Sequence, residues 1–587
     1  MKNIKVFVNF FQKVAGFGTE SQGFQGLGRS PKVLKTLALT LILAPALFSG
    51  CTDDIDIPLP LATASPPRPA PVETAALQEP PEPESLVPRP GGTLRLSMRA
   101  PMTLNPLLNE DVTVARVLQL MFEPLIAFDE ELRPIPHLAS LEFSFTGGAA
   151  VVTIRDDALW SDGEPVTADD LIHSIQTLQS APDEVIYKRN VENFSYVEKL
   201  DERSVRITFE TISGGAAYMF NFPITPRHHF DDMAPVGNGP FKFDSFTETL
   251  RLVRCSNTFR SRPYIDEIHV LITPDAETDL HAFDRGLTDI YKATVPDWAR
   301  HHSVKPVRFA EHLAMHYEFI GFNFSRDIPR LHALRQAVAH TIDVQTLISD
   351  IFLTHAMPAS SPIHPASWLY DRDHGYDHGY NEANISAHGY DMELAQFFAT
   401  QVLRENLWPI GEEQTEGQAS DGEEIQWVEL PLTVLVNEEN VERILIARTI
   451  VNQMNSIGLF AELVALPFDD FYWHLQNGYF DLFVGGYNLS LQPDLRFAFH
   501  SESAENFLSY NDPEFDRLLE AAAVSGTDSG FFRTISDIQL HMARELPVIS
   551  LAFRHSAVVA DRRVQGDLRP GPDNIFINVH EWFVVAD

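Results

Sequence analysis

The sequence predicts an α/β protein built from more than one lobe. Its 587 residues are more than a single compact core usually holds. The composition, 44% hydrophobic and 21% charged, is that of a globular protein. Residues 432–464 have the pattern of a strand, a helix and a second strand, which is typical of a βαβ unit. Together these observations indicate an α/β body with at least two lobes.

An export signal is predicted at residues 1–50. Lys32 and Lys35 precede an apolar run from Thr36 to Phe48, which is shorter than the roughly 20 residues that span a bilayer. The tetrapeptide Phe48-Ser49-Gly50-Cys51 resembles a bacterial lipobox, so Cys51 is predicted to become the lipidated first residue of the mature protein. The alternatives are ordinary cleavage, which leaves Cys51 free, and an uncleaved anchor.

The segment that follows, residues 51–90, is predicted to be a tether. It is rich in Pro, Ala and Glu, as in Ser65-Pro66-Pro67-Arg68-Pro69. Such a composition buries no core and favours an extended chain. We therefore expect the globular body to be held away from a membrane surface.

Charge and cysteine content exclude some classes of protein. The formal net charge is −37, and the leader is basic, so the rest of the chain is more acidic still. Such a surface repels phosphate backbones, and no nucleic-acid partner is expected. Cys51 and Cys255 are the only cysteines. If Cys51 is lipidated, Cys255 has no intramolecular partner, so no disulfide is expected and Cys255 is predicted to be a buried apolar residue.

Local patterns place several elements in the body. Residues 92–98 alternate apolar and polar side chains, and residues 151–154 and 205–209 are further strand candidates. Residues 169–178 have helical spacing, with Thr167 as the N-cap. The other predicted elements are a longer amphipathic helical region at 331–351, a strand at 432–436, a helix at 441–457, a strand at 461–464 and an acidic surface insertion at 411–425.

Several segments resemble the family 5 extracellular solute-binding proteins, which serve ABC importers of peptides and nickel chelates. The most specific is the run Trp160–Asp170, WSDGEPVTADD. The other matching segments, in chain order, are Leu104–Pro106, Met121–Leu125, Gly237–Phe241, Gly321–Phe324, Arg335–Ala337, Ile342-Asp343, Tyr479–Asp481 and Tyr510–Asp516. The similarity covers roughly residues 90–587, and so many segments in one order make it specific.

The resemblance implies a two-lobe, type II periplasmic-binding-protein fold with a hinge of two connecting segments, near Tyr317–Phe324 and Pro547–Val559. The first lobe is expected to be discontinuous. It would occupy residues 91–314, with an inserted subdomain at about 135–220. The C-terminal residues 551–587 would return to the same lobe. The second lobe would occupy residues 315–550. Closure of such a hinge buries a solute between the lobes.

The resemblance also implies where a solute binds. In the peptide binders of the family, a Trp and then an Asp follow a Phe-Asp pair, and that Asp contacts the α-amino group of the peptide. After Phe480-Asp481, Tyr487 falls at the Trp position and Leu489 or Ser490 at the Asp position. Neither Leu nor Ser neutralises an ammonium group, so the usual amine contact is missing, with Asp494 as the alternative.

Tyr487 and Asn488 are therefore the preferred solute contacts, with Phe468 and Tyr187 as further aromatic candidates. The competing interpretation is that these aromatic rings pack in a core. The predicted function is capture of an oligopeptide-like solute for an ABC permease by a monomeric, lipid-anchored protein on the outer face of the membrane. No cofactor is expected.

Other functions are kept as alternatives. His374, His378 and His388 lie near Asp373, Asp377 and Asp391 and suggest a metal site, although the same run reads as a solvated, turn-rich loop. A metal chelate or another non-peptide solute, and a solute sensor, are further alternatives. An enzyme is not expected, because the sequence has no nucleophile elbow, zinc-binding HExxH helix or phosphate-binding loop.

Overall fold

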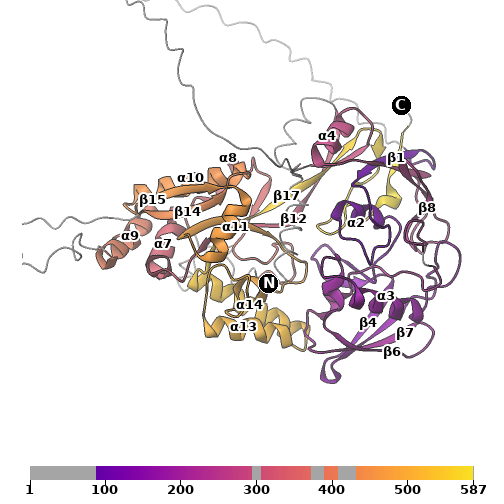
Figure 1. Ribbon diagram of the computed structural model, residues 1–587, viewed down its shortest axis with the longest axis horizontal. Coiled ribbons are helices and arrows are strands. Elements are labelled where there is room, and N and C mark those ends of the chain that lie inside the picture. Colours follow the sequence, from indigo (N-terminus) through magenta and orange to yellow (C-terminus); the bar gives the residue numbers. More distant parts are fainter. Residues whose placement is uncertain (1–86, 230, 294–305, 372–388, 407–430, 586–587) are drawn as a thin grey trace, which may run out of the picture. The chain divides into compact units, whose positions relative to one another are not determined.

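The computed structural model describes residues 87–229, 231–293, 306–371, 389–406 and 431–585. From Pro88 onward these residues belong to one compact unit. Two four-stranded sheets and one seven-stranded sheet carry its architecture (Figure 1).

The first four-stranded sheet contains the predicted strand at 92–98. Its strands, in spatial order, are β1 (Thr93–Met98), β10 (Glu267–Ile272), β9 (Thr249–Arg254) and β8 (Phe241–Phe246). Leu94, Leu96 and Met98 are buried, while the residues between them are only partly covered. The alternation seen in the sequence is therefore that of a strand with one buried face, and the prediction is confirmed.

The second four-stranded sheet is antiparallel throughout. Its strands, in spatial order, are β4 (Ala139–Ser144), β5 (Ala149–Ile154), β7 (Ser204–Phe209) and β6 (Phe194–Lys199). Helix α3 (Ala168–Ser180) covers this sheet, and its Ile175 shares a buried core with Val152 and Ile207 (Figure 1). The strands predicted at 151–154 and 205–209 are confirmed.

Helix α3 begins where the sequence predicts. Thr167 is the N-cap, and the Asp170 carboxylate accepts hydrogen bonds from the Thr167 amide at 2.8 Å and from its hydroxyl at 2.9 Å. Asp170 also accepts from the Trp160 indole at 3.3 Å and from the Arg227 amide at 2.8 Å. This part of the WSDGEPVTADD segment therefore fixes the entry into a helix.

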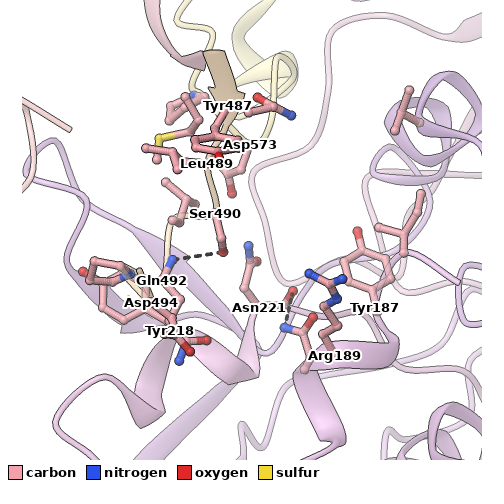
Figure 2. Close-up of a pocket in the computed structure, with 18 of the residues that line it drawn as sticks. Tyr187, Arg189, Tyr218, Asn221, Tyr487, Leu489, Ser490, Gln492, Asp494 and Asp573 are labelled. Atoms are coloured by element: carbon pink, nitrogen blue, oxygen red, sulfur yellow. Dashed lines mark hydrogen bonds between the residues drawn. The ribbon is translucent and has the colours of Figure 1, made fainter. Parts of the chain in front are cut away.

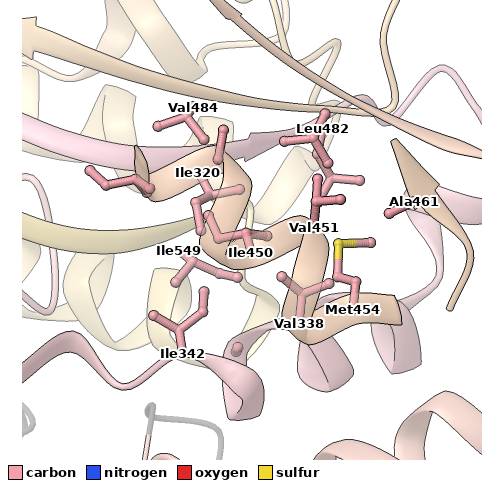
Figure 3. Close-up of a cluster of buried hydrophobic side chains, with 14 of the residues drawn as sticks. Ile320, Val338, Ile342, Ile450, Val451, Met454, Ala461, Leu482, Val484 and Ile549 are labelled. Carbon is pink, nitrogen blue, oxygen red and sulfur yellow. The ribbon is translucent and has the colours of Figure 1, made fainter. Parts of the chain in front are cut away.

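The seven-stranded sheet runs β11 (Ile290–Ala293), β17 (Val548–Asp561), β12 (Val307–Phe322), β16 (Leu482–Asn488), β14 (Leu432–Asn437) and β15 (Ala461–Leu466), with β13 (Ala356–Pro358) also paired to β17. Strands β14 and β15 are parallel, and α10 (Val441–Ser456) connects them, so the predicted βαβ unit is confirmed. Ile450, Val451 and Met454 of α10 pack on the sheet in the core shown in Figure 3.

Two long strands, β12 and β17, pass from one core to another. Val558 and Ala560 of β17 pack with the β1 sheet, whereas Ile549 and Leu551 of the same strand pack under β14 and β16. We call the part built on the β1 and β4 sheets the first lobe, and the part built on β14–β16 and the helices within residues 332–545 the second lobe. Both predicted hinge segments fall on these two strands or at their ends.

The helical region predicted at 331–351 is wrong in one respect, because it is two helices, α7 (His332–Thr341) and α8 (Val344–Asp350). Ile342 adopts an extended backbone, and Asp343 caps α8 by accepting from the Thr346 amide at 3.1 Å. The remaining longer helices are α2 (Val112–Leu118), α4 (Ala276–Asp284), α9 (Met392–Asn406), α11 (Phe468–Asn477), α13 (Pro513–Val524) and α14 (Asp528–Glu545).

Several predictions fall outside the described residues: the leader, Cys51, most of the tether, the insertion at 411–425, and His374, His378 and His388. Within the described ranges, none of the helices has the length and apolar character needed to cross a membrane. Cys255 is buried, as expected, and burial raises the pKa of its thiol.

Candidate functional site

A cavity of about 1580 Å³ is lined by residues from both lobes. The first lobe contributes α2, the segments around Tyr187 and Asn221, strand β11 and the turn at Pro572–Phe576. The second lobe contributes the end of β16, the loop that follows it, and parts of α13 and α14. Figure 2 shows Tyr187 and Arg189 of the first lobe apart from Leu489 of the second lobe.

Tyr487 and Asn488 lie at the end of β16, where the strand reaches the cavity. The strand is held by antiparallel pairing with β12, in which Tyr487 is opposite Tyr317. The Tyr487 ring stacks on Phe319 with centroids 5.0 Å apart and meets the edge of Phe497 at 5.3 Å. Tyr487 therefore packs against a core and also lines the cavity, so the arrangement is compatible with both interpretations, core packing and solute contact.

Asp494 also lines the cavity, but its carboxylate already has a partner. Arg496 donates to it twice, from Nε at 2.9 Å and from Nη2 at 2.6 Å. Burial alone would raise the pKa of Asp494, yet the hydrogen bonds and charge of Arg496 hold that pKa below its ordinary value. Its negative charge is balanced within the second lobe.

Tyr187 faces the cavity from the first lobe (Figure 2). Burial raises the pKa of the Tyr187 hydroxyl to about 12, and the charge of Asp573 adds to the shift. Asp573 lies in the turn at Pro572–Phe576, and burial raises the pKa of its carboxyl, which the Asn221 side chain partly offsets by hydrogen bonding. Among the described residues no cation forms an ion pair with Asp573.

Phe468 lies elsewhere. It is the first residue of α11, and its ring stacks on Tyr472 with centroids 6.1 Å apart. It packs at the border of a second-lobe core and is not among the residues that line the cavity. The structure therefore brings together Tyr187, Tyr487, Asn488 and Asp494, and leaves Phe468 apart.

The two lobes touch beside the cavity. The Trp368 indole of the second lobe donates to the Tyr218 hydroxyl of the first lobe at 3.0 Å, and the Arg133 guanidinium lies 4.3 Å from the centre of the indole ring. Gly214 and Gly215 pack closely against Phe531 of α14. Tyr218 and Phe531 also line the cavity, so these contacts between the lobes lie at its edge.

Several cavity residues were missed from the sequence: Arg116, Arg189, Tyr218, Asn221, Lys292 and Asp573. They come from five separate segments of the first lobe, and no local pattern relates one to another. Only one of them could be placed from the sequence. The predicted return of residues 551–587 to the first lobe places Asp573 in that lobe. Among the described residues there is no group of three or more His, Cys, Asp or Glu side chains suited to hold a metal ion.

Comparison with known proteins gives one family match. The sequence model of the bacterial extracellular solute-binding proteins, family 5 Middle, matches residues 133–507. The oligopeptide-binding protein AppA of Bacillus subtilis (strain 168) is 23% identical over 524 residues, which cover 85% of this chain and 92% of AppA.

Solved structures of three such proteins have the same fold. AppA of B. subtilis in complex with a nonapeptide superposes with a TM-score of 0.60 at 22% identity. The substrate-binding protein CtaP of Listeria monocytogenes gives 0.70 at 20%, and NikZ of Campylobacter jejuni in complex with Ni(L-His) gives 0.62 at 20%. Each comparison covers 85% of this chain and 100% of the other. The predicted two-lobe fold is confirmed.

Proposed function

The chain belongs to family 5 of the bacterial extracellular solute-binding proteins, and we propose that it captures an oligopeptide-like solute outside the cytoplasm for an ABC importer. The observation that carries the proposal is the cavity lined by both lobes. A solute held there contacts both lobes at once, so its binding energy favours the arrangement in which they meet.

The size of the cavity supports a solute longer than a single small molecule. Pockets for drug-sized ligands usually enclose roughly 300–1,000 Å³, whereas this cavity has about 1580 Å³. The relative AppA was solved with a nonapeptide. A peptide of several residues suits this volume, and the exposed amide of Asn488 is able to donate to and accept from a peptide backbone.

Asp573 is our candidate for the contact with the solute's amino group. It is partly buried, lines the cavity and forms no ion pair with a described cation, whereas Asp494 is already paired with Arg496. A carboxylate without a counter-ion in a partly buried place is costly, and a solute ammonium removes that cost. The missing family Asp at Leu489 or Ser490 would then be replaced from the other lobe.

Delivery of the solute would take place at the membrane. We propose that Cys51 is lipidated, that the Pro-rich segment at 51–90 acts as a tether, and that the body works as a monomer with an ABC permease. Replacing Cys51 by Ser tests the attachment. The variant should appear in the soluble fraction, and one that stays in the membrane fraction would contradict lipidation at this residue.

The experiment for the function is to purify the protein without its leader under mild conditions and identify released solutes by mass spectrometry. Each candidate is then returned to the emptied protein while its thermal unfolding is followed. Peptides should be found and should raise Tm, because a ligand that binds only the folded state stabilises it. Absence of peptides, together with no response of Tm to a peptide mixture, would contradict the proposal.

A metal chelate is the second candidate, because NikZ, which was solved with Ni(L-His), shares the fold. The same thermal measurement with nickel–histidine and with Fe(III)–EDTA distinguishes the two. A response to a chelate alone would replace the peptide with this class of solute. Deletion of the gene tests a sensor. A deletion strain that still takes up peptide but no longer responds to it would favour that function.

A further inference from the structure

Two partly buried cations of the cavity have no counter-ion among the described residues. Arg116 is in the last turn of α2, and Lys292 is on β11, where it is opposite Val558 of β17. Both side chains line the cavity and both residues are partly buried. Neither forms an ion pair or a side-chain hydrogen bond with any residue in the part of the chain that the structure describes.

The two carboxylates that attract Arg116 electrostatically, Asp279 and Asp111, are engaged elsewhere. Asp279 accepts from Arg99 Nη1 at 2.8 Å and from the Thr273 hydroxyl at 2.6 Å. Asp111 is the N-cap of α2 and accepts from the Thr113 amide at 2.7 Å. Both attract Arg116 electrostatically, but neither lies within ion-pair distance of it.

Arg116 and Lys292 are close enough to disfavour each other. The charge of Arg116 is the main reason that the pKa of Lys292 falls to about 7, and burial contributes the rest. The neighbouring imidazoles add no charge, because burial lowers the pKa of His364 to about 4 and that of His312 to about 3. An anion placed between the two cations would remove their repulsion and stabilise both charges.

We propose that Arg116 and Lys292 form a subsite for a carboxylate of the solute. This inference rests on the proposed function, since it names the chemistry of the solute in the same cavity. The other three arginines of the cavity differ from this pair. Arg189 is exposed to solvent, whereas Arg99 is paired with Asp279 at 2.8 Å and Arg496 with Asp494 at 2.6 Å. Ile363 and His364 of the second lobe line the same cavity.

A carboxylate has two sources. In a peptide it is the C-terminus or an acidic side chain, and in a metal chelate it belongs to a polycarboxylate ligand. The shared chemistry is a planar oxygen pair, which a guanidinium binds bidentately and an ammonium binds as a point charge.

The test uses three hexapeptide libraries with free amino termini. The first lacks Asp and Glu and ends in a carboxylate, the second is the same library ending in a carboxamide, and the third is the carboxamide library with one Glu per peptide. The emptied protein is equilibrated with each, retained peptides are counted by mass spectrometry, and Kd is measured by calorimetry for peptides that are retained. Fe(III)–EDTA forms a fourth arm.

We expect at least one carboxylate-bearing probe to bind about tenfold or more tightly than the neutral carboxamides, as for a hydrogen bond between charged groups. Retention of the first library alone identifies the peptide C-terminus as the source of the carboxylate. Retention of the third library alone identifies an acidic side chain, and binding of Fe(III)–EDTA alone identifies a chelate. Equal binding of charged and neutral libraries would overturn the subsite and leave the proposed function standing. Binding of no probe at all would overturn both.

Variants separate the subsite from general charge effects. Lys292→Met and Arg116→Gln should each abolish the preference for a carboxylate, and Lys292→Arg should retain it. The matched control is Lys199→Met, which removes a cation on β6 that is paired with Asp169 outside the cavity. If Lys292→Met does not fold, as judged by its thermal transition, Lys292→Gln and Lys292→Arg carry the comparison. A preference that survives loss of both cations would contradict the proposal.

Discussion

The indole nitrogen of Trp368 lies 3.0 Å from the hydroxyl oxygen of Tyr218, to which it donates a hydrogen bond. Tyr218 belongs to the first lobe and in turn donates to the Leu132 carbonyl at 3.0 Å. Trp368 belongs to the second lobe, and its own amide donates to the Glu131 carbonyl at 2.9 Å. The lobes are therefore joined by a small polar network at the edge of the cavity.

Replacing Trp368 by Phe should weaken solute binding without unfolding the protein. The change removes a hydrogen bond between the lobes. This bond stabilises the same arrangement of the lobes that a bound solute stabilises, so its loss should lower the affinity for the solute. A hydrogen bond contributes about 0.5–1.5 kcal/mol, which is roughly twofold to tenfold in Kd. Calorimetry with a retained peptide measures this, and Trp473→Phe, an exposed residue outside the cavity, is the control. Equal affinities of the two variants would show that the contact does not assist binding.

Replacing Asp573 by Asn should lower affinity for peptides with a free amino terminus and leave acetylated peptides little affected. The loss should be about tenfold or more, since a hydrogen bond to a charged group is removed. Asp494→Asn should have a smaller effect on this preference, because that carboxylate is already held by Arg496. A preference for the free amine that disappears in Asp494→Asn and persists in Asp573→Asn would reverse the assignment.

The buried carboxylate of Glu318 should stabilise the fold in a pH-dependent way. It accepts from Arg443 Nε at 2.8 Å and lies 3.5 Å from Arg554 Nη1, which is on β17. Burial alone would raise the pKa of Glu318, but the charges of both arginines and a hydrogen bond donated by His316 hold that pKa well below its ordinary value. Because the folded-state pKa is depressed, this stability is complete above the unfolded value of about 4.3 and is lost as pH falls below it.

Glu318→Gln should therefore cost about 3–5 kcal/mol at pH 7, since it leaves the largely buried guanidinium of Arg443 without its carboxylate. Urea unfolding of both proteins at pH 7 and at pH 4 and below measures this, and the difference between them should shrink as pH falls. Glu202→Gln, at an exposed site, is the control. A difference that does not change with pH would contradict the assigned charge state.

Gly237 should be required for packing and not for solute contact. A Cβ there would lie 2.1 Å from the Met121 carbonyl oxygen, so the backbone would have to move. Gly237→Ala should lower the free energy of unfolding by about 1–3 kcal/mol or more, whereas Gly526→Ala, with 3.5 Å to its nearest atom, should change it little. Thermal unfolding tests this. Unchanged stability with lost binding would instead place Gly237 in the site.

Local signals predicted the elements but not the site. The βαβ unit at 432–466 and the start of α3 follow from periodicity and from the pairing of Thr167 with Asp170, which are three residues apart. The split between α7 and α8 was missed, although Asp343 is a good N-cap, because apolar spacing continues across it.

The cavity could be predicted only where the family resemblance supplied a position, as at Tyr487 and Asn488. Lys292 lines the cavity from β11, a strand held by pairing with β17, more than 250 residues later in the chain. Asp573 reaches the cavity because its turn packs near α2, where Gln119 donates to the Asp573 carbonyl at 2.9 Å. Such long-range neighbours leave no trace in local composition.

A crystal structure of the protein purified with its own solute tests the central claim most directly. The account predicts a peptide-like molecule between the lobes, beside Tyr487, with its amino group at Asp573 and a carboxylate at Arg116 and Lys292. An empty cavity with the solute bound at another surface, or a solute that the protein has chemically converted, would contradict it.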